Sequence, residues 1–234
     1  KEIIKKYKIN CHLKPGVATL GFNSKEVNGL HKYAEYLEKK YNYDGLGKLD
    51  HNVCRTICGS EKYKGGILDM NAAHLHPLRF VFGLAKAAIQ AGADIFEQSE
   101  VTSLLPGKVN RTLTYSGEIQ SEFVVLGCNG YLGNLEQKVA AKVMPINNFI
   151  VATEPLGDRA KNVLAKDIAV ADTKFVVNYF RLSNDQRLLF GGGENYSYKF
   201  PTNITSTVLK PMLKIFPHLS DVKIHYAWGG TLGI

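Results

Sequence analysis

The sequence predicts an α+β protein in which a part built from helices and a parallel-type strand is joined to a larger antiparallel sheet. Two observations lead to this fold class. In the first half, apolar stripes of helical period precede a continuous apolar run at 123–126, which is typical of a strand buried on both faces. From about residue 145, strand-like runs follow one another with polar turns between them, which favours antiparallel pairing.

The first long helix is expected to be capped by Ser24 and to end near Tyr41. Its apolar residues recur at spacings of three and four and form one stripe, made of Val27, Leu30, Ala34, Leu37 and Tyr41. A shorter helix is expected over about 50–58. The run 65–76 is expected to form two short strands separated by a turn.

A second long helix is expected to begin at Pro77, because proline suits the first helical position and His76 precedes it. Gly92 is expected to close this helix. A strand is then predicted at 93–97, followed by short strands between 100 and 127 with turns at 106–107 and 116–117. The last of these is the apolar strand at 123–126.

The remaining elements are mostly strands. A long strand is predicted within 143–156, and a helix follows near 158–165. Three further strands are predicted at 167–172, 174–183 and 187–193. A helix is predicted at 203–216 and a final strand at 222–228. The polar connection at 183–186 suits a hairpin.

The charge of the chain is uneven. The net charge is +8, and residues 1–64 hold 13 Lys and Arg against 7 Asp and Glu. A solvated helical face explains this excess better than nucleic-acid binding, since no known nucleic-acid motif is present. No run approaches the roughly 20 apolar residues of a membrane span.

The cysteines and histidines form no recognisable site. Four cysteines without a dense disulfide framework predict a reducing, cytoplasmic location; they are Cys11, Cys54, Cys58 and Cys128. Cys-x3-Cys and His-x-His in the middle of the first half lack a standard zinc-finger spacing. No metal is therefore predicted.

Two glycine-rich segments are candidate binding sites. The three glycines at 191–193 follow a strand, but neither Gly-Lys-Ser/Thr nor a helix follows them, so they are not a phosphate loop. They indicate either a bulge or the close approach of a ligand. The apolar strand at 123–126 ends in Gly127, at an edge where ligands bind in α/β folds, or simply at a tight turn.

Alternation along a strand places Tyr179 and Arg181 on one face. An arginine beside a tyrosine makes a good carboxylate site, because the guanidinium offers two parallel donors. The alternative is an ordinary cross-strand pair at the surface. No Ser/His/Asp or paired-carboxylate group stands out elsewhere.

Taken together, several stretches resemble one family. The chain is similar to FAD-dependent amine and amino-acid oxidoreductases of the D-amino-acid oxidase/glycine oxidase superfamily, and within it to gamma-glutamylputrescine oxidase-like proteins. The similarity covers nearly the whole chain and rests on CHLKPG, GGILDMNAAHLHPL, EFVVLGCNGYLG, VMPINNFIVATEPL, FVVNYFRLSNDQRLLFGGG and HYAWGG.

The resemblance implies an FAD-binding, Rossmann-like domain and an antiparallel substrate domain that covers the flavin. Residues 1–60 would be a helical segment joining the domains, 61–75 and 145–230 the substrate domain, and 76–144 the remainder of the FAD-binding domain. The implied reaction oxidises the C–N bond of a small amine or amino acid by hydride transfer to FAD, giving peroxide and an aldehyde or keto product. No side-chain base is required.

The resemblance also implies site residues. Val101 would touch the adenine end of FAD, and Gly127, Cys128 and Asn129 would lie along its ribose and pyrophosphate. Trp228 and Gly229 would approach the flavin ring. On the substrate side would lie Tyr179 and Arg181, with Gly192 and Gly193 permitting close approach.

The chain departs from the family pattern at both ends. It lacks the opening strand, G-x-G-x-x-G and helix, and the glycine-rich segment that follows the WGG strand in the family. We therefore expect an internal fragment that alone binds FAD weakly and turns over no amine. The alternative is a non-catalytic remnant or partner-binding subunit of the same fold.

Overall fold

The computed structural model describes residues 1–196 and 199–234. The helices are α1 (Glu2–Lys6), α2 (Ser24–Tyr41), α3 (His51–Ile57), α4 (Pro77–Gln90), α5 (Gln137–Ala140) and α6 (Ile204–Ile215). Short 3-10 turns form η1 (Asn129–Tyr131), η2 (Gly157–Asn162) and η3 (Pro217–Leu219).

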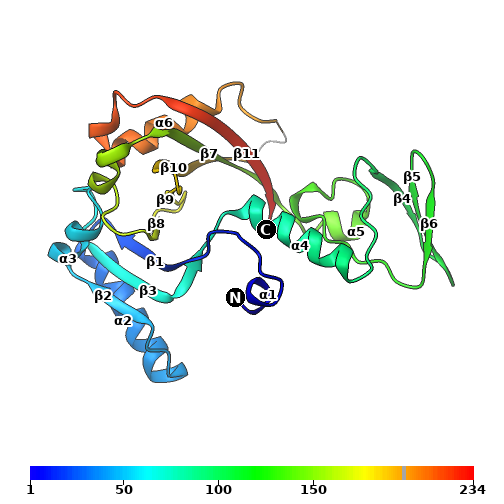
Figure 1. Cartoon of the computed structure of the whole chain (residues 1–234), viewed down its shortest axis with the longest axis horizontal. Coiled ribbons are helices and arrows are strands. Elements are labelled where there is room, and N and C mark those ends of the chain that lie inside the picture. Colours follow the sequence, from blue (N-terminus) through cyan, green and yellow to red (C-terminus); the bar gives the residue numbers. More distant parts are fainter. Residues whose placement is uncertain (197–198) are drawn as a thin grey trace.

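The strands form two sheets. The larger is built from β1 (Lys14–Gly21), β2 (Leu46–Leu49), β3 (Gly65–His74), β7 (Pro145–Pro155), β8 (Ala169–Asp172), β9 (Tyr179–Leu182), β10 (Arg187–Asn195) and β11 (Ile224–Gly233). The smaller is built from β4 (Val101–Leu105), β5 (Asn110–Thr114) and β6 (Glu118–Ser121). Figure 1 shows the small sheet at one end of the molecule, joined to the large one through α4 and the chain around α5.

The large sheet has the order β11-β7-β10-β9-β8-β1-β3-β2. Its neighbouring strands run antiparallel except β1 and β8, which are parallel. The predicted α+β class is thus confirmed. The predicted hairpin at 183–186 joins β9 and β10. Residues 1–60 are not purely helical, since they contribute β1 and β2 to this sheet.

The two long helices begin where the sequence places them. The His76 side chain caps α4 by accepting the Arg79 N–H at 3.4 Å, and Pro77 takes the first position. The predicted cap of α2 is wrong by one residue, because Asn23, not Ser24, accepts the Glu26 N–H, at 3.0 Å. A capping residue needs extended backbone, which Asn23 has, whereas Ser24 is already helical.

Three strand predictions are wrong. The run 65–76 is not two strands, because β3 continues without a turn and pairs with β1 on one side and β2 on the other. Residues 93–97 and 123–126 form no strand. No described strand lies beside them to complete a ladder, and Phe123 and Val125 are 82% and 92% exposed. An apolar run therefore does not become a buried strand without neighbours.

The main core lies between one face of the large sheet and α6 with η3. Phe180 of β9 stacks on Phe190 of β10 with ring centroids 5.7 Å apart, and Phe216 meets the Phe180 ring edge-on at 5.1 Å. Figure 1 shows α6 lying along this face, over β7 and β10. Because alternate residues of a strand point to opposite faces, the residues between those of the core form a second face of these strands, which is not part of this core.

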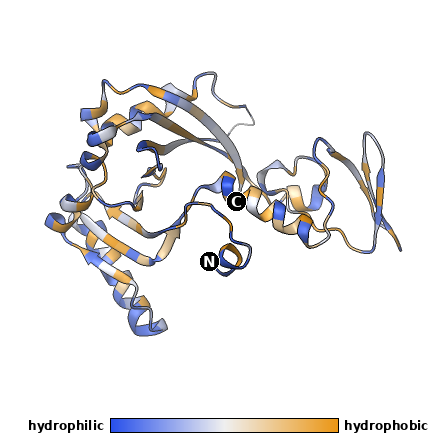
Figure 2. Cartoon of the chain, viewed as in Figure 1, coloured by the Kyte–Doolittle hydropathy of each residue, from blue (hydrophilic) through white to orange (hydrophobic). Residues whose placement is uncertain are grey.

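Not all apolar surface is covered. Figure 2 shows apolar residues along α4, and four of its side chains are more than half exposed: Leu78, Val81, Phe82 and Ile89. Within the described part of the chain, none of the helices combines the length and apolar character needed to cross a bilayer.

One stability prediction follows from the buried thiols. Burial raises the pKa of Cys58 from its ordinary value of 9.0 to about 12, so the folded chain keeps a proton that the unfolded chain loses in that interval. The contribution of Cys58 to stability is therefore complete below pH 9 and is lost as the pH rises toward 12, by at most about 1.4 kcal/mol per pH unit. Burial raises the pKa of Cys54 and of Tyr179 as well, which adds to the fall in stability over this range. Urea unfolding between pH 8 and 11 measures this slope.

The matched control for this titration is a second cysteine. Cys58→Ala is expected to make the slope above pH 9 shallower by the share of Cys58, and Cys128→Ala, at a half-buried position, is expected to leave it unchanged. An unchanged slope in Cys58→Ala would contradict the assignment.

Candidate functional site

The open face of the large sheet presents two of the residues that were predicted from the sequence for substrate binding. Tyr179 pairs with Gly191 and Arg181 with Leu189 across β9 and β10, while Phe180 points the other way into the core. The prediction that Tyr179 and Arg181 share a face is confirmed. This face is the one that α6 does not cover.

A cavity of about 420 Å³, the Arg181 cavity, lies on this face. Arg181 of β9 and Trp228 of β11 both line it, although two strands separate them in the sheet. The structure thus brings together one residue predicted for the substrate and one predicted for the cofactor. The remaining lining residues come from β7, β10, β11, the hairpin at 183–186 and the chain around His12 and His76.

Arg181 is the available cation of this cavity. Its side chain is half-buried, and burial lowers its pKa although the charge of Asp167 opposes this. Among the described residues no Asp or Glu forms an ion pair with it, and its one hydrogen bond runs to the Leu182 carbonyl at 3.3 Å. A partly desolvated guanidinium with free donors favours a carboxylate ligand.

The neighbouring Arg187 has a different role. Its Nε donates to Asp185 at 2.6 Å, and its Nη1 donates to the Thr153 carbonyl at 2.9 Å. Its guanidinium also lies over the Tyr226 ring at 5.3 Å. Arg187 is therefore neutralised and fixed in the wall, which leaves Arg181 to attract an anion.

Two histidines, which no pattern in the sequence placed here, also line the Arg181 cavity. The rings of His12 and His76 meet edge-on with centroids 6.0 Å apart. Partial desolvation, then the positive charge of Arg79, lowers the pKa of His12, so this imidazole is neutral at pH 7. His12 has φ +52, and the backbone there brings it beside the start of α4. Its only signal in the sequence is its place in CHLKPG.

Tyr179 lies on the same sheet face as Arg181 but does not line the Arg181 cavity. Its hydroxyl donates to Asn148 Oδ1, and burial, then the charge of Glu194, raises its pKa to about 12. Gly191 makes room for its ring, since a Cβ at Gly191 would lie 2.0 Å from Tyr179 Cζ. The sequence placed Gly191 in the candidate run 191–193 without singling it out, yet it is the glycine that this face requires.

Gly192 and Gly193 lie toward α6 instead. The register of β10 against β7 shifts between Gly191 and Glu194, which makes this stretch a bulge. A Cβ at Gly192 would lie 2.9 Å from Asn178 Oδ1, and Gly193, at φ +83, faces Thr207 of α6. The structure does not bring these two glycines to the face of Tyr179 and Arg181.

Gly191→Ala is expected to destabilise the chain by roughly 1–3 kcal/mol, because the new methyl group must displace the Tyr179 ring. Urea unfolding of Gly191→Ala, Tyr179→Ala and the double variant measures the coupling between the two positions. In the Tyr179→Ala background the cost of Gly191→Ala should largely disappear.

Gly29→Ala is the control for this cycle. No atom lies within 4 Å of a Cβ at Gly29 in α2, so this change should stabilise the chain by up to about 1 kcal/mol. Additive effects of Gly191→Ala and Tyr179→Ala would contradict the steric argument.

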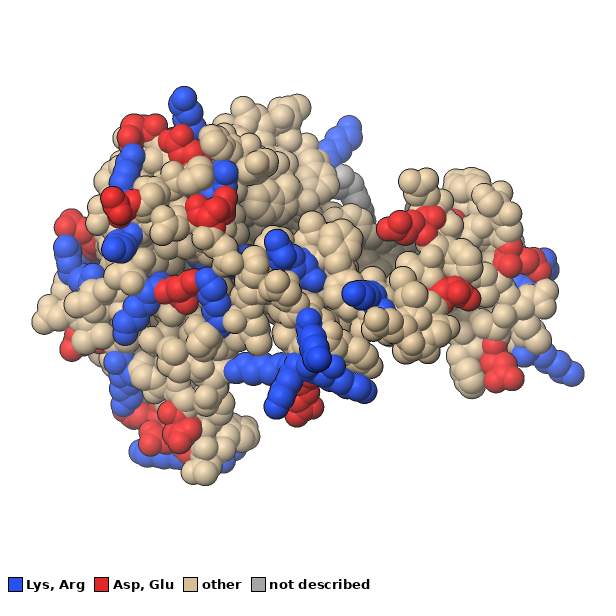
Figure 3. All heavy atoms as spheres, in the orientation of Figure 1, with Lys and Arg blue, Asp and Glu red and all other residues tan. Residues whose placement is uncertain are grey.

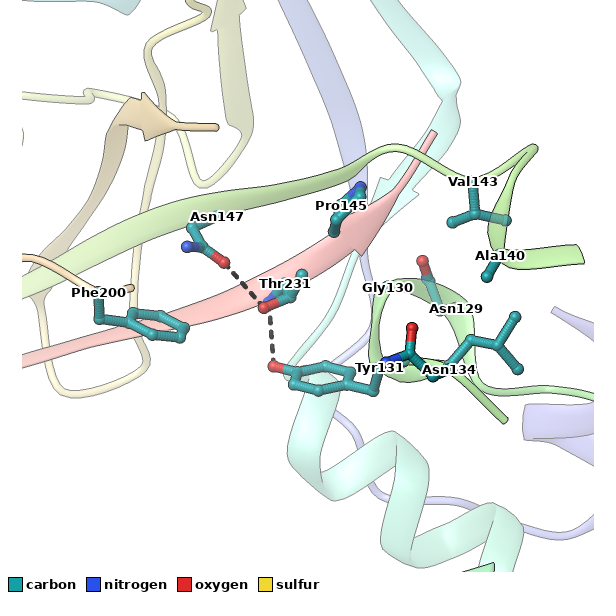
Figure 4. A pocket seen from close by; sticks show the side chains of 12 residues that line it. Asn129, Gly130, Tyr131, Asn134, Ala140, Val143, Pro145, Asn147, Phe200 and Thr231 are labelled. Carbon is teal, nitrogen blue, oxygen red and sulfur yellow. Dashed lines mark hydrogen bonds between the residues drawn. The ribbon is translucent and has the colours of Figure 1, made fainter. Parts of the chain in front are cut away.

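A second cavity, of about 770 Å³, lies where η1 meets the ends of β7 and β11 (Figure 4). The Tyr131 hydroxyl accepts the Thr231 N–H at 2.9 Å, and Thr231 Oγ1 donates to Asn147 Oδ1 at 2.8 Å. Asn129, which lines this Asn129 cavity, accepts the Gly233 N–H. Thr231 and Asn147 pair on the same sheet face as Phe149, opposite to Trp228.

The comparisons with known proteins agree with this geometry. The family model described as "DAO: FAD dependent oxidoreductase" matches residues 1–233. The chain belongs to this family. It is 37% identical over 227 residues to a probable oxidoreductase OrdL of Rhizobium meliloti, covering 97% of this chain and 53% of the relative. It is 34% identical to the gamma-glutamylputrescine oxidoreductase of Escherichia coli, covering 99% and 54%.

Solved structures of low sequence identity share the DAO-type fold. The glycine oxidase of Geobacillus kaustophilus superposes with a TM-score of 0.79 at 17% identity, covering 99% of this chain and 62% of that one. The L-proline dehydrogenase of P. horikoshii gives 0.79 at 19% identity, covering 98% and 64%. The chain spans about half the length of the curated relatives that it matches.

The DAO family is FAD-dependent, so the fit of FAD to the described residues can be examined. Trp228, 42% exposed, and Tyr226, 59% exposed, offer aromatic surface beside Arg181, which suits one side of a flat ring. No G-x-G-x-x-G is present to hold the phosphates. Among the described residues, the aromatic side chains of this cavity therefore suit the ring of the cofactor.

The other residues predicted for FAD in this DAO-family chain do not line the Arg181 cavity. Val101 opens β4 in the small sheet. Cys128 precedes η1 and lines a smaller hollow of about 240 Å³, while a Cβ at Gly127 would meet nothing within 4 Å. Gly229 faces Phe149 and Phe200, on the opposite side of β11 from Trp228. The structure therefore gathers only Trp228 with the substrate residues.

Proposed function

We propose that the protein carrying this chain oxidises the C–N bond of a small amine or amino acid that bears a carboxylate, with gamma-glutamylputrescine as the first candidate. The observation that supports this is Arg181, a partly buried cation without a described acidic partner, in one cavity with Trp228. The family and the named relative support the reaction class.

In this proposal the chain binds and orients the substrate. FAD, when bound, accepts the hydride from the carbon next to the nitrogen. Arg181 holds the substrate carboxylate through two parallel hydrogen bonds. No second positive charge competes for the carboxylate, because His12 is neutral and Arg187 is paired with Asp185. Trp228 and Tyr226 provide the apolar surface that keeps water from this side.

The wider assignments are part of the same proposal. Residues 61–75 and 145–230 form the substrate-binding part, and 76–144 belong to the FAD-binding part. Gly127, Cys128 and Asn129 contact FAD along its ribose and pyrophosphate, Val101 contacts its adenine end, and Gly229 approaches its ring. Gly192 and Gly193 are left out of the substrate side, because they lie toward α6.

The location proposed for the protein is the reducing cytoplasm. All four cysteines are free in the structure, as a reducing compartment requires. The absence of a disulfide framework in the sequence supports the same location.

The experiment is an anaerobic titration of the protein that carries this chain, with FAD supplied. We expect gamma-glutamylputrescine to bleach the flavin absorbance and putrescine, which lacks the carboxylate, to bleach it far more slowly. Glycine and sarcosine extend the series. If no amine or amino acid reduces the flavin, a non-catalytic, partner-binding role takes the place of this proposal.

A further inference from the structure

A third cavity, of about 400 Å³, lies between α1 and α4. Three cationic side chains line it: Lys8, Arg79 and Lys86. No Asp or Glu lines it, and it shares no lining residue with the Arg181 cavity. We call it the Lys8 cavity.

The sequence of α4 creates one wall of this cavity. Arg79, Gly83 and Lys86 follow one another at spacings of four and three, which places them on one face of the helix. A Cβ at Gly83 would lie 2.2 Å from Ile9 Cγ2. The missing side chain therefore lets the segment after α1 pack directly on α4, between the two cationic residues.

Lys8 occupies an unusual backbone position. It has φ +52 at the end of α1, where its N–H reaches the Lys5 carbonyl at 3.3 Å and the next N–H, of Ile9, reaches the Ile4 carbonyl at 3.0 Å. Helices commonly end with glycine at such a left-handed position. A lysine there is strained, and strained non-glycine residues concentrate at functional sites.

The positive charges of this cavity are not neutralised by the described residues. Lys8, Arg79 and Lys86 form no ion pair with any Asp or Glu there. Figure 3 shows Lys and Arg side chains gathered over α1 and the adjacent part of α4, with little acidic surface among them. Like charges held close together repel one another, and a bound anion would remove this repulsion.

We propose that the Lys8 cavity binds a diphosphate group, either free or as part of a nucleotide. A single carboxylate would satisfy one cation, whereas a diphosphate carries several charges in a small volume. The forked donors of Arg79 and the ammonium groups of Lys8 and Lys86 suit its oxygens. The amide of Asn10, which also lines the cavity, can add a neutral hydrogen bond.

Titration calorimetry of the whole chain with inorganic pyrophosphate, at low salt and without free FAD, which itself carries a diphosphate, tests this. We expect binding that weakens as salt is added. Arg79→Gln/Lys86→Gln should weaken it by about tenfold or more. The control is Lys210→Gln/Lys214→Gln, which removes two exposed cations from another helix, α6, and should leave binding unchanged.

Lys8→Gly separates a binding role from a structural one. Because glycine suits the left-handed backbone, this variant should melt at the same or a higher temperature while binding pyrophosphate at least about threefold more weakly. Comparison of pyrophosphate with ADP shows whether a nucleoside adds affinity.

Three outcomes would overturn the proposal. They are no heat of binding with pyrophosphate, equal weakening in the α6 control, and binding to anionic phosphatidylglycerol vesicles in the absence of any pyrophosphate binding. The experiment measures no amine oxidation, so its result is independent of the proposed reaction.

Discussion

Arg181→Gln is expected to lower kcat/KM for a carboxylate-bearing amine by about 10²–10⁴-fold in the protein that carries this chain. Each hydrogen bond to a charged group contributes about 1.5–3 kcal/mol, and a guanidinium can make two of them to one carboxylate. The same substitution should change kcat/KM for an amine without a carboxylate by less than about threefold. Steady-state peroxide release with gamma-glutamylputrescine and putrescine measures both values.

The control for this change is Arg55→Gln. Arg55 pairs with Glu61 at 3.2 Å on the exposed surface, and such pairs contribute little to stability. Arg181 lies on the sheet face opposite the core, so neither variant should change the melting temperature by more than a few degrees. Equal losses for the two substrates, or equal losses in the two variants, would remove Arg181 from the substrate site.

Phe180→Ala is expected to destabilise the chain by roughly 3–5 kcal/mol, because its ring occupies the centre of the aromatic core. Phe180 is 2% exposed and contacts Phe190, Phe216 and Tyr63, the last with ring centroids 6.3 Å apart. Urea unfolding followed by circular dichroism measures the loss. Phe180→Leu, which keeps most of the volume, should cost about 1 kcal/mol and stays measurable if the alanine variant does not fold.

A surface phenylalanine provides the comparison. Phe175 is 91% exposed, and Phe175→Ala should change the free energy of unfolding by less than about 0.5 kcal/mol. A small loss in Phe180→Ala would mean that the core is able to collapse around the missing ring.

Much of the local structure could be predicted because it depends on neighbouring residues. Pro77 and His76 determine the start of α4, and the spacing of apolar residues determines the extent of α2. Alternation alone placed Tyr179 and Arg181 on one face of β9. The family could also be recognised, because its motifs run along the whole chain.

Features that depend on distant contacts could not be predicted in this way. The run 123–126 has the composition of a buried strand, but a strand exists only where another strand completes its hydrogen bonds, and none is described there. Likewise, one turn was expected within β3, where pairing with β1 and β2 keeps the strand continuous.

The sequence by itself determined the start of α4, the hairpin at 183–186 and the placement of Tyr179 and Arg181 on one face of β9. Only the tertiary structure decided which residues share a cavity with Arg181. His12 precedes it by more than 160 positions and Trp228 follows it, and the sheet order and the left-handed backbone at His12 place both beside it. The tertiary structure also decided that the three glycines at 191–193 have different neighbours. The Tyr179 ring fills the space beside Gly191, and α6 lies against the bulge at Gly192 and Gly193.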